Sequence, residues 1–337
     1  MSSVRSSADE AFKQSGGPPA LRDSKMKPIL KDVVEGIQLL STHNFYLAED
    51  ARRPEGPNIG LDGEHLTISF LSLNRAHLAE RLCKSIASEM PQFKGEVLAV
   101  DNGSNADELN SLRGMLATMP FRWRVVALDR NFGVAGGRNR TIPHVTTPWL
   151  MCIDDDIYFI SNPLKRIQSD LAGLGCKFLN LPFLGPDRKL LSNGAILHVV
   201  RENDETSVLC ESAYECGRTH DADGPGFLSS MLCGGASVFE VQTFSTVGRY
   251  DENIFVGFED IDLSIRLFRG GYKVGVGGAV CLVHDHEKPT SEPAKEYERT
   301  RYSPALLNES ARYLENKYGY KFWWKGALEW LNERAKI

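Results

Sequence analysis

From residue 65 onward, short apolar runs alternate with segments whose apolar residues recur at helical spacing. The runs predict four strands, over Leu66–Leu71, Glu96–Val100, Trp123–Leu128 and a stretch that begins at Trp149. The segments between them predict helices, over Arg75–Met90 and around Leu109, Leu112 and Leu116. Repeats of this kind imply right-handed crossovers and parallel strand pairing. We therefore expect an α/β, Rossmann-like fold with a mostly parallel sheet flanked by helices.

The second half of the chain is less regular. Asn162-Pro163 is a typical helix start, and a second helix opens at Glu259 and stops at Gly270-Gly271. The polar, turn-rich segment Glu202–Gly224 predicts a mobile loop near a ligand. Further strands are expected over Lys177–Phe183, Ala195–Val200, Tyr272–Val276 and Ala279–Val283.

The sequences of the two ends differ in pattern from the middle of the chain, which suggests a division into three parts. Residues 1–26 are rich in Ser, Gly, Pro and charge, and Pro28–Tyr46 suits a helix or a short mixed element. We expect a partly disordered N-terminal extension over 1–64 and a compact domain over 65–290, with halves at 65–160 and 161–290. Residues 291–337 are expected to form a helical, aromatic-rich segment.

Composition narrows the class of protein. The formal net charge of −5 over 337 residues does not indicate the excess of basic residues that is typical of nucleic-acid-binding proteins. The seven cysteines form no CxxC pair, which favours reduced, buried thiols in a cytosolic protein. The polar start Met1–Gln14 does not resemble a signal peptide, and no apolar run approaches transmembrane length. We expect a cytoplasmic protein.

The stretch Trp149–Ile157 carries the strongest chemical signal. Five apolar residues, typical of a strand buried on both faces, run into Asp154, Asp155 and Asp156. In an extended chain residues i and i+2 point the same way, so Asp154 and Asp156 could converge on Mg²⁺ or Mn²⁺. A solvated acidic turn or a helix N-cap explains the three carboxylates equally well.

Four other polar groups follow predicted strands or open predicted helices, and each has a structural alternative. Asp101 ends a strand, but Asp-Asn-Gly-Ser is also strong turn chemistry. The glycine-rich segment Asn131–Asn139 could bring backbone N–H groups to a phosphate or could simply turn into a helix. Glu259-Asp260 could hold an ionised base or cap a helix. His284 directly follows an apolar run, and it could be a metal ligand or a surface histidine.

The order of these motifs resembles a family 2 glycosyltransferase with the GT-A fold. The motifs are Leu73-Asn74-Arg75, Val100–Ser104, Asn131–Asn139, Ile153–Asp156 and Gly257–Leu263, and the resemblance covers about residues 65–286. It is closest to the branch with rhamnosyl- and galactofuranosyltransferase-like members. It implies an inverting hexosyl or deoxyhexosyl transfer from a nucleoside-diphosphate sugar, with UDP- or dTDP-sugars favoured, to a glycan or lipid-linked saccharide.

The resemblance also implies roles for individual residues. Asp260 would be the general base, and Glu259 would support it or bind the acceptor. Asp154, Asp156 and His284 would hold Mn²⁺ or Mg²⁺ against the donor diphosphate. The donor would contact Asn74, Arg75, Asp101, Gly136, Gly137, Arg138 and Asp155. In this scheme residues 65–160 bind the nucleotide sugar and residues 161–290 form the acceptor half.

The segment Tyr318–Leu331 mixes aromatic residues with lysines. This composition suits a bilayer interface, where a lipid-linked acceptor would lie and where the protein could make peripheral contact. Packing of the aromatics on the catalytic domain, or at a dimer interface, is the favoured alternative.

Two other functions fit the same fold. A non-catalytic sugar-nucleotide-binding protein would not need to keep both Asp154–Asp156 and Glu259-Asp260. A nucleotidyltransferase would normally have a glycine-rich, basic loop directly after the first strand, where this chain has Ser72-Leu73-Asn74-Arg75. The donor sugar, the acceptor, the linkage and the oligomeric state are not encoded in any recognisable motif.

Overall fold

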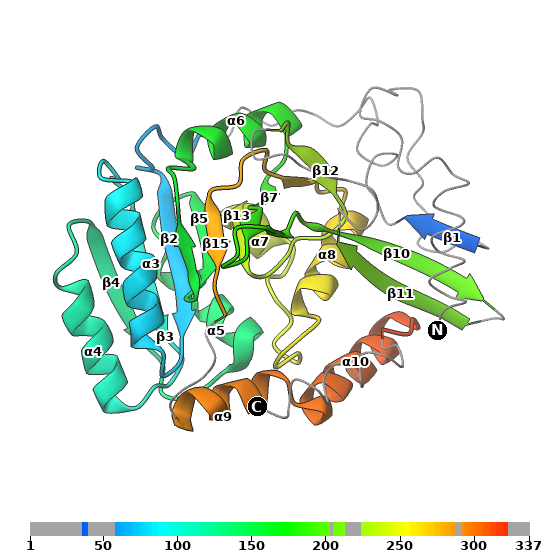
Figure 1. The fold of residues 1–337 in the computed structure, drawn as a ribbon. Coiled ribbons are helices and arrows are strands. Elements are labelled where there is room, and N and C mark those ends of the chain that lie inside the picture. Colours follow the sequence, from blue (N-terminus) through cyan, green and yellow to red (C-terminus); the bar gives the residue numbers. More distant parts are fainter. Residues whose placement is uncertain (1–35, 40–57, 203–204, 213–223, 287–291, 323–337) are drawn as a thin grey trace.

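The computed structural model describes residues 36–39, 58–202, 205–212, 224–286 and 292–322, and a sheet of eight strands forms the centre of this part (Figure 1). The strand order is β12-β14-β7-β13-β5-β2-β3-β4. Strands β2 (Leu66–Ser72), β3 (Glu96–Asp101), β4 (Arg122–Ala127) and β5 (Trp149–Asp154) run parallel to one another.

The other half of this sheet mixes directions. Strand β13 (Ala236–Glu240) is antiparallel to both β5 and β7 (Phe178–Asn180). Strand β14 (Val274–Val276) is parallel to β7 and antiparallel to β12 (Phe227–Ser229). The sheet is therefore mixed and mostly parallel, as the alternating pattern predicted.

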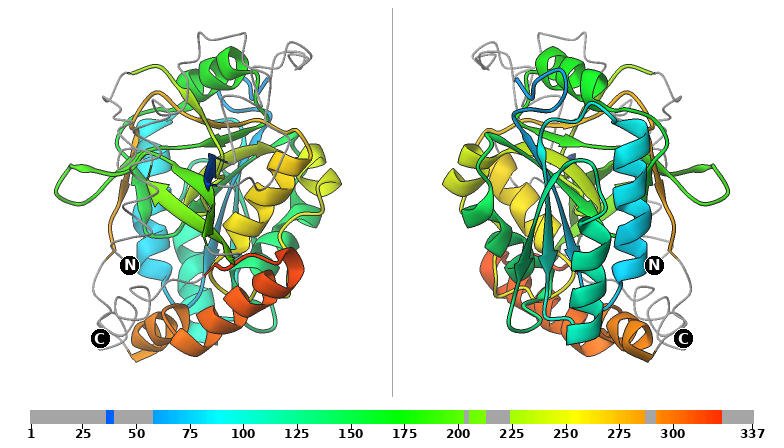
Figure 2. Two further views of the ribbon diagram at one scale, coloured as in Figure 1. Left: turned by 90° about the vertical axis from the view of Figure 1, so that its right-hand side faces the viewer. Right: turned by 90° about the vertical axis from the view of Figure 1, so that its left-hand side faces the viewer.

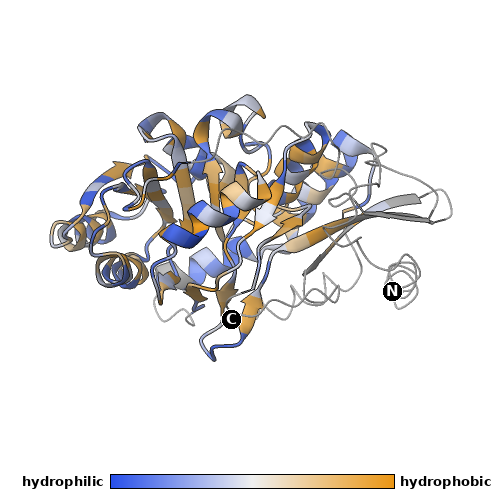
Figure 3. Ribbon diagram, turned by 90° about the horizontal axis from the view of Figure 1, so that it is seen from above, coloured by the Kyte–Doolittle hydropathy of each residue, from blue (hydrophilic) through white to orange (hydrophobic). Residues whose placement is uncertain are grey.

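Helices cover both faces of the sheet (Figures 1 and 2). They are α3 (Ala76–Glu89), α4 (Ala106–Leu116), α5 (Gly133–Thr141), α6 (Leu164–Leu174), α7 (Val241–Thr246) and α8 (Glu259–Arg269), and a 3₁₀ turn, Ile142–His144, follows α5. Strand β5 alternates between two cores: Met151 shares one with Leu82 of α3, and Leu150 shares the other with Leu263 of α8. Figure 3 shows the apolar strands between more polar helices.

Two smaller sheets flank the centre. One has the order β6-β15-β8-β9, from β6 (Ile157–Phe159), β15 (Leu282–His284), β8 (Phe183–Leu184) and β9 (Leu190–Ser192). Because β15 pairs antiparallel with β6, His284 lies opposite Ile157, directly after the three aspartates. The other sheet joins β1 (Gly36–Leu39), β10 (Ala195–Glu202) and β11 (Glu205–Ser212), and its hairpin extends away from the main sheet (Figure 1).

Two helices follow the sheets. Helices α9 (Glu292–Arg301) and α10 (Pro304–Tyr318) run along the side of the molecule toward which β2 and β3 point (Figure 1). The Ser303 hydroxyl caps α10, and Gly319 ends it in a left-handed conformation. Within the described residues, no helix combines the length and apolarity needed to cross a bilayer.

The structure corrects several local predictions. Glu202–Gly224 was expected to be a loop, but Glu205–Ser212 forms β11, because its main chain pairs with β10 regardless of its polar side chains. The glycine-rich turn is itself helix α5. Within Pro28–Tyr46 the described part, Gly36–Leu39, is a strand. The division of the chain at residues 64 and 290 stays a prediction.

Candidate active site

The three aspartates at the end of β5 take three different partners. Strand β5 ends at Asp154, and Asp155 and Asp156 form the turn to β6. Asp154 accepts a hydrogen bond from Arg138 Nη2 at 2.8 Å, and Asp155 pairs with Arg75. Asp156 faces two histidines. The expected convergence of Asp154 and Asp156 is not seen, because the turn ends the strand alternation after Asp154.

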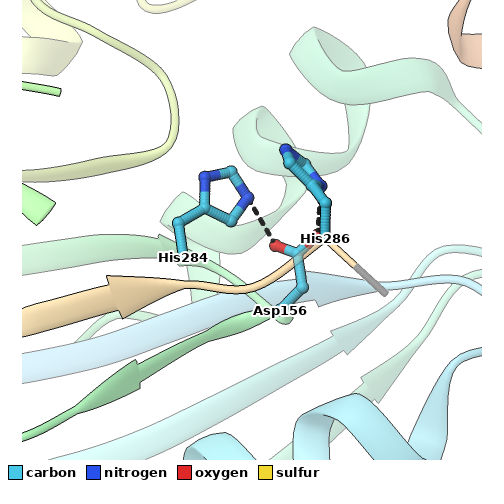
Figure 4. Close-up of side chains that lie close together, drawn as sticks. All are labelled: Asp156, His284 and His286. Carbon is cyan, nitrogen blue, oxygen red and sulfur yellow. Dashed lines mark ion pairs between the residues drawn. The ribbon is translucent and has the colours of Figure 1, made fainter. Parts of the chain in front are cut away.

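Asp156, His284 and His286 form a cluster of possible metal ligands (Figure 4). Asp156 Oδ1 lies 3.0 Å from His284 Nε2, and Oδ2 lies 3.0 Å from His286 Nδ1. One ligand atom from each residue falls within 4.8 Å of the others. Oδ1 and His284 Nε2 are buried and, despite their separation, make no hydrogen bond with proper geometry. Such unsatisfied, converging polar atoms fit a divalent cation.

The kind of ligand narrows the choice of cation. Two imidazoles and one carboxylate suit Mn²⁺ better than Mg²⁺, which prefers oxygen ligands. Burial would raise the pKa of Asp156, but His284, His286 and Arg75 hold this pKa well below its usual value. Asp156 is therefore ionised and available as a ligand at neutral pH.

Arg75 links the cluster to the start of α3. Its buried guanidinium pairs with Asp155 and also lies 3.0 Å from Asp156 Oδ2. The same group stacks over the Tyr297 ring, 4.8 Å from its centroid. Burial raises the pKa of Asp155 to about 6, and Arg75 opposes that shift.

A pocket opens beside Asp155 at the carboxyl ends of β2 and β3, the edge where open α/β sheets bind ligands. Its walls come from β2, from the loops around Asn102 and Asn131, from the start of α5, from Phe255-Val256 and from α9. The Asn102 side chain donates to Asn131 Oδ1 and accepts from Phe132 N, which fixes the loop above β3.

Asp101 and Asn74 lie next to this pocket without lining it. Asp101 is buried, and its Oδ2 accepts from Ser104 N at 3.2 Å, so the turn expected from Asp-Asn-Gly-Ser forms. Asn74 has a φ of 55° and accepts from Asn105 N, which joins the ends of β2 and β3. Both side chains accept hydrogen bonds from backbone N–H groups and so fix the loops beside the pocket.

Gly136 and Gly137 are packed inside helix α5. A Cβ at position 137 would lie 2.7 Å from Leu71 Cδ1, and one at 136 would lie 3.0 Å from Phe132 Cβ. Neither residue lines the pocket. Gly137 lets α5 approach β2 closely, and Gly136 leaves room for the Phe132 side chain.

A second group of charges lies at the start of α8. Phe258 adopts a left-handed φ of 69° and leads into Glu259 and Asp260. Asp260 Oδ1 accepts from its neighbour Ile261 N, and Glu259 Oε2 is buried with no hydrogen-bond partner. Burial raises the pKa of Asp260 to about 7, and the charge of Glu259 adds to the shift. A carboxyl with this pKa can exchange a proton near neutral pH.

Arg138 and Gly234-Gly235 connect the two groups of charges. Arg138 donates a hydrogen bond to Asp154 and also interacts electrostatically with Glu259. A Cβ at position 234 would lie 2.7 Å from Arg138 Nη1, which is buried and without a hydrogen-bond partner. Glycine therefore leaves room around an unsatisfied donor between the aspartates and α8.

Residues 70–176 match the family described as Glycosyl transferase family 2. This part of the chain is therefore similar to that family. The matched region includes Arg75, Asp101, Arg138 and all three aspartates. His284, His286 and Glu259-Asp260 follow it, so the match alone says nothing about their roles. No curated protein matches the chain.

Solved structures share the fold of this chain. A structure of GalNAc-T7 with UDP, GalNAc and Mn²⁺ aligns with a TM-score of 0.52 and 14% identity, over 81% of this chain and 54% of that one. The chain thus spans about half the length of that protein. This likeness shows the fold alone, a GT-A-like α/β fold with a mixed, mostly parallel sheet.

Two further structures are less similar. The mannosyltransferase PcManGT from Pyrobaculum calidifontis, in complex with GDP-Man and Mn²⁺, has a TM-score of 0.49 and 15% identity, over 80% of this chain and 84% of that one. TarS 1-349 from S. aureus has a TM-score of 0.47 and 14% identity, over 75% and 72%. None of these comparisons supports a rhamnosyl- or galactofuranosyltransferase-like branch, which stays a prediction.

Six of the predicted site residues lie together around the end of β5: Arg75, Arg138, Asp154, Asp155, Asp156 and His284. It also adds residues that the sequence did not single out: His286, Asn102, Tyr297, Thr300 and Arg301. His286 had a usable signal, since it lies two residues after His284 and can point the same way in an extended chain. The α9 residues had no local signal.

Proposed function

We propose that this protein is an inverting, metal-assisted glycosyltransferase that uses a nucleoside-diphosphate sugar. The observation that carries this proposal is the cluster of Asp156, His284 and His286 beside a pocket at the carboxyl ends of β2 and β3. In this arrangement a divalent ion would lie next to a pocket at the edge of the sheet where nucleotides commonly bind. The family 2 match over 70–176 supports the same reading.

Each group of residues has a task in the proposed reaction. A bound Mn²⁺ or Mg²⁺, held by Asp156 with His284 and His286, would act as a Lewis acid that offsets the charge on the leaving diphosphate. Asp260 takes the proton of the acceptor hydroxyl as that oxygen attacks the anomeric carbon from the opposite face. Arg138 and Asp154 lie between the two groups, where their polar atoms can hold sugar hydroxyls.

The base of the nucleotide would be read at Asp101. Because Oδ2 already accepts from Ser104 N, the other oxygen is left for one N–H donor. Uracil and thymine offer a single N3–H, whereas guanine offers two adjacent N–H groups. We therefore favour UDP- or dTDP-sugars as donors, and a glycan or lipid-linked saccharide as acceptor.

A thermal-shift screen of UDP-, dTDP- and GDP-sugars, each with and without Mn²⁺, tests the proposal. We expect a rise in melting temperature with at least one donor, larger with Mn²⁺, and smaller in Asp156→Asn. Asp187→Asn, a change of an exposed aspartate, serves as the control. If no nucleoside-diphosphate sugar shifts the wild-type melting temperature, the proposed function is wrong.

The pH dependence of transfer tests Asp260 as the base. Because its pKa is about 7, the ionised, proton-accepting form predominates only above that value. We expect kcat/KM to rise with pH through about 7 and then level off. Asp260→Asn should lower kcat by roughly 10²–10⁴-fold and leave the donor-induced thermal shift intact. Full activity in this variant would remove Asp260 from the role, and retention of anomeric configuration in the product would contradict inversion.

A further inference from the structure

Helix α9 closes one side of the pocket. Tyr297, Thr300 and Arg301 line it, and Tyr297 and Arg301 are four residues apart, on one face of the helix. The other face carries an exposed charge network, in which Arg299 lies 2.8 Å from Glu292 and 2.9 Å from Glu296. Figure 1 shows α9 at the end of the molecule toward which β2 and β3 point. The helix thus turns one arginine toward the pocket and another toward solvent.

Arg301 differs from the other arginines near the site in its charge partners. Arg75 pairs with Asp155, Arg138 with Asp154, and Arg299 with two glutamates. In the part of the chain that the structure describes, Arg301 makes no ion pair, and its Nη1 donates to Tyr297 Oη at 3.3 Å. Burial lowers the pKa of Arg301, but nearby Tyr297, Asp154 and Asp156 raise it, so the guanidinium stays charged. Because it makes no ion pair of its own, this guanidinium can bind an anionic ligand.

Three other donors that line the pocket are already used. Gly133 N donates to Asn131 Oδ1 at 2.9 Å, and Val134 N donates to Phe255 O at 3.0 Å. The Thr300 hydroxyl donates to Glu296 O. The start of α5 therefore does not offer these N–H groups to a phosphate. Tyr297 Oη accepts from Arg301, which leaves its own O–H free to donate.

Given the proposed function, we propose that Arg301 binds the diphosphate of the donor and that the Tyr297 hydroxyl donates to the same group. Helix α9 would then be part of the donor site. It would supply a fixed positive charge on the side of the pocket opposite the β2 and β3 loops. This assignment also explains why a helix beyond the family 2 match encloses the pocket.

Calorimetric titrations with a nucleoside diphosphate and with the matching nucleoside separate a phosphate contact from a general defect. The probe is UDP, dTDP or GDP, whichever the wild type binds, in EDTA and again in Mn²⁺. We expect Arg301→Ala to weaken diphosphate binding by roughly 10- to 100-fold in both buffers. Nucleoside binding should change by no more than about twofold.

Matched variants complete the experiment. Arg299→Ala, on the same helix but facing solvent, should bind both probes like the wild type. Tyr297→Phe should weaken the diphosphate alone, by roughly three- to tenfold. It also keeps the test open if Arg301→Ala does not fold. The diphosphate affinity of Arg301→Lys should fall between those of wild type and Arg301→Ala. Lysine keeps the positive charge but lacks the planar set of N–H donors of the guanidinium.

Two results would overturn the inference. One is unchanged diphosphate affinity in both Arg301→Ala and Tyr297→Phe. The other is an equal loss of diphosphate and nucleoside affinity, which would mean that Arg301 only supports the pocket's shape. A wild-type protein that binds none of the three diphosphates would overturn the proposed function itself, together with this inference.

Discussion

At the scale of single residues, Asp156 and Asp260 show how surroundings assign chemistry to a carboxylate. Asp156 is buried and Asp260 is partly buried, and burial alone raises a carboxyl pKa. Asp156 faces two histidines and Arg75, so its pKa falls well below the usual value. Asp260 faces Glu259, so its pKa rises to about 7. The first is suited to hold a cation and the second to take a proton.

The raised pKa of Asp260 predicts a cost in stability. Between its ordinary value of 3.8 and about 7, the unfolded chain releases a proton that the folded protein keeps. The stability that this group contributes is therefore lost as the pH rises across that range. We expect Asp260→Asn to be more stable than wild type at pH 8, by up to about 4 kcal/mol, and similar to it near pH 4. Urea unfolding at the two pH values measures this, and an equal difference at both would contradict it.

The two histidines predict a loss of metal affinity. His284→Ala and His286→Ala each remove one imidazole next to Asp156, so each should weaken Mn²⁺ binding by roughly 10- to 100-fold. Calorimetric titration with MnCl₂ measures the affinity without any donor. His144→Ala, a change of an exposed histidine, is the control. Unchanged affinity in His286→Ala would leave Asp156 and His284 as the site.

Residue chemistry could be predicted from the sequence more readily than residue partners. The aspartates, Glu259-Asp260 and His284 stand out because each directly follows a predicted strand or opens a helix. Arg75 and Arg138 were expected to contact the donor, but their pairing with Asp155 and Asp154 is visible only in the fold. The predicted pairing of Asp154 with Asp156 needed an extended chain, and the turn after Asp154 removes it.

At the scale of elements, helix α5 packs closely on β2, which its glycine-rich sequence did not predict. Its glycines were expected to form a turn near a ligand, yet they lie inside a helix that packs on β2. A turn and a glycine-rich helix have similar local sequences. The deciding contact, Gly137 with Leu71, joins segments far apart in the chain, so local patterns could not reveal it. The main strands were predicted well because their apolar runs are buried on both faces.

Two helical glycines give a matched test of this packing. Gly137→Ala would place a Cβ 2.7 Å from Leu71, so we expect a loss of about 1–3 kcal/mol of unfolding free energy. Gly114→Ala, on α4, meets nothing within 4 Å and should gain about 0.5–1 kcal/mol from helix propensity. Chemical denaturation measures both. A stabilised Gly137→Ala would show that the packing adapts easily.

At the scale of the whole molecule, α10 is tied to the element that carries Asp260. Lys317 lies 2.7 Å from Asp251 and 2.7 Å from Asp262, which is fully buried on α8. Tyr318, together with Tyr320 and Phe322, packs beside them in a shared core. The described part of the aromatic segment 318–331 is therefore packed on the domain, while Trp323, Trp324 and Trp330 lie outside the described residues.

Removing the Lys317 charge should loosen this connection. Lys317→Met keeps the aliphatic stem but leaves two carboxylates short of a partner, so we expect a loss of about 1–3 kcal/mol at pH 7. The exposed pair of Lys84 and Glu80 offers the control Lys84→Met, with a loss below about 0.5 kcal/mol. Burial would raise the pKa of Asp251, but Lys317 helps to hold it low. The difference should therefore shrink as the pH falls below 3.8, the ordinary Asp value.

The position of α9 along the chain has a consequence for protein synthesis. Every other residue that lines the pocket precedes Gly257, whereas α9 begins at Glu292. On the ribosome, the sheet and its loops emerge before the pocket has its last wall. A nucleotide that needs that wall cannot stabilise the growing chain, so the early domain must fold on its own contacts. With α9 as part of the proposed donor site, donor binding would protect only chains whose synthesis has passed α9.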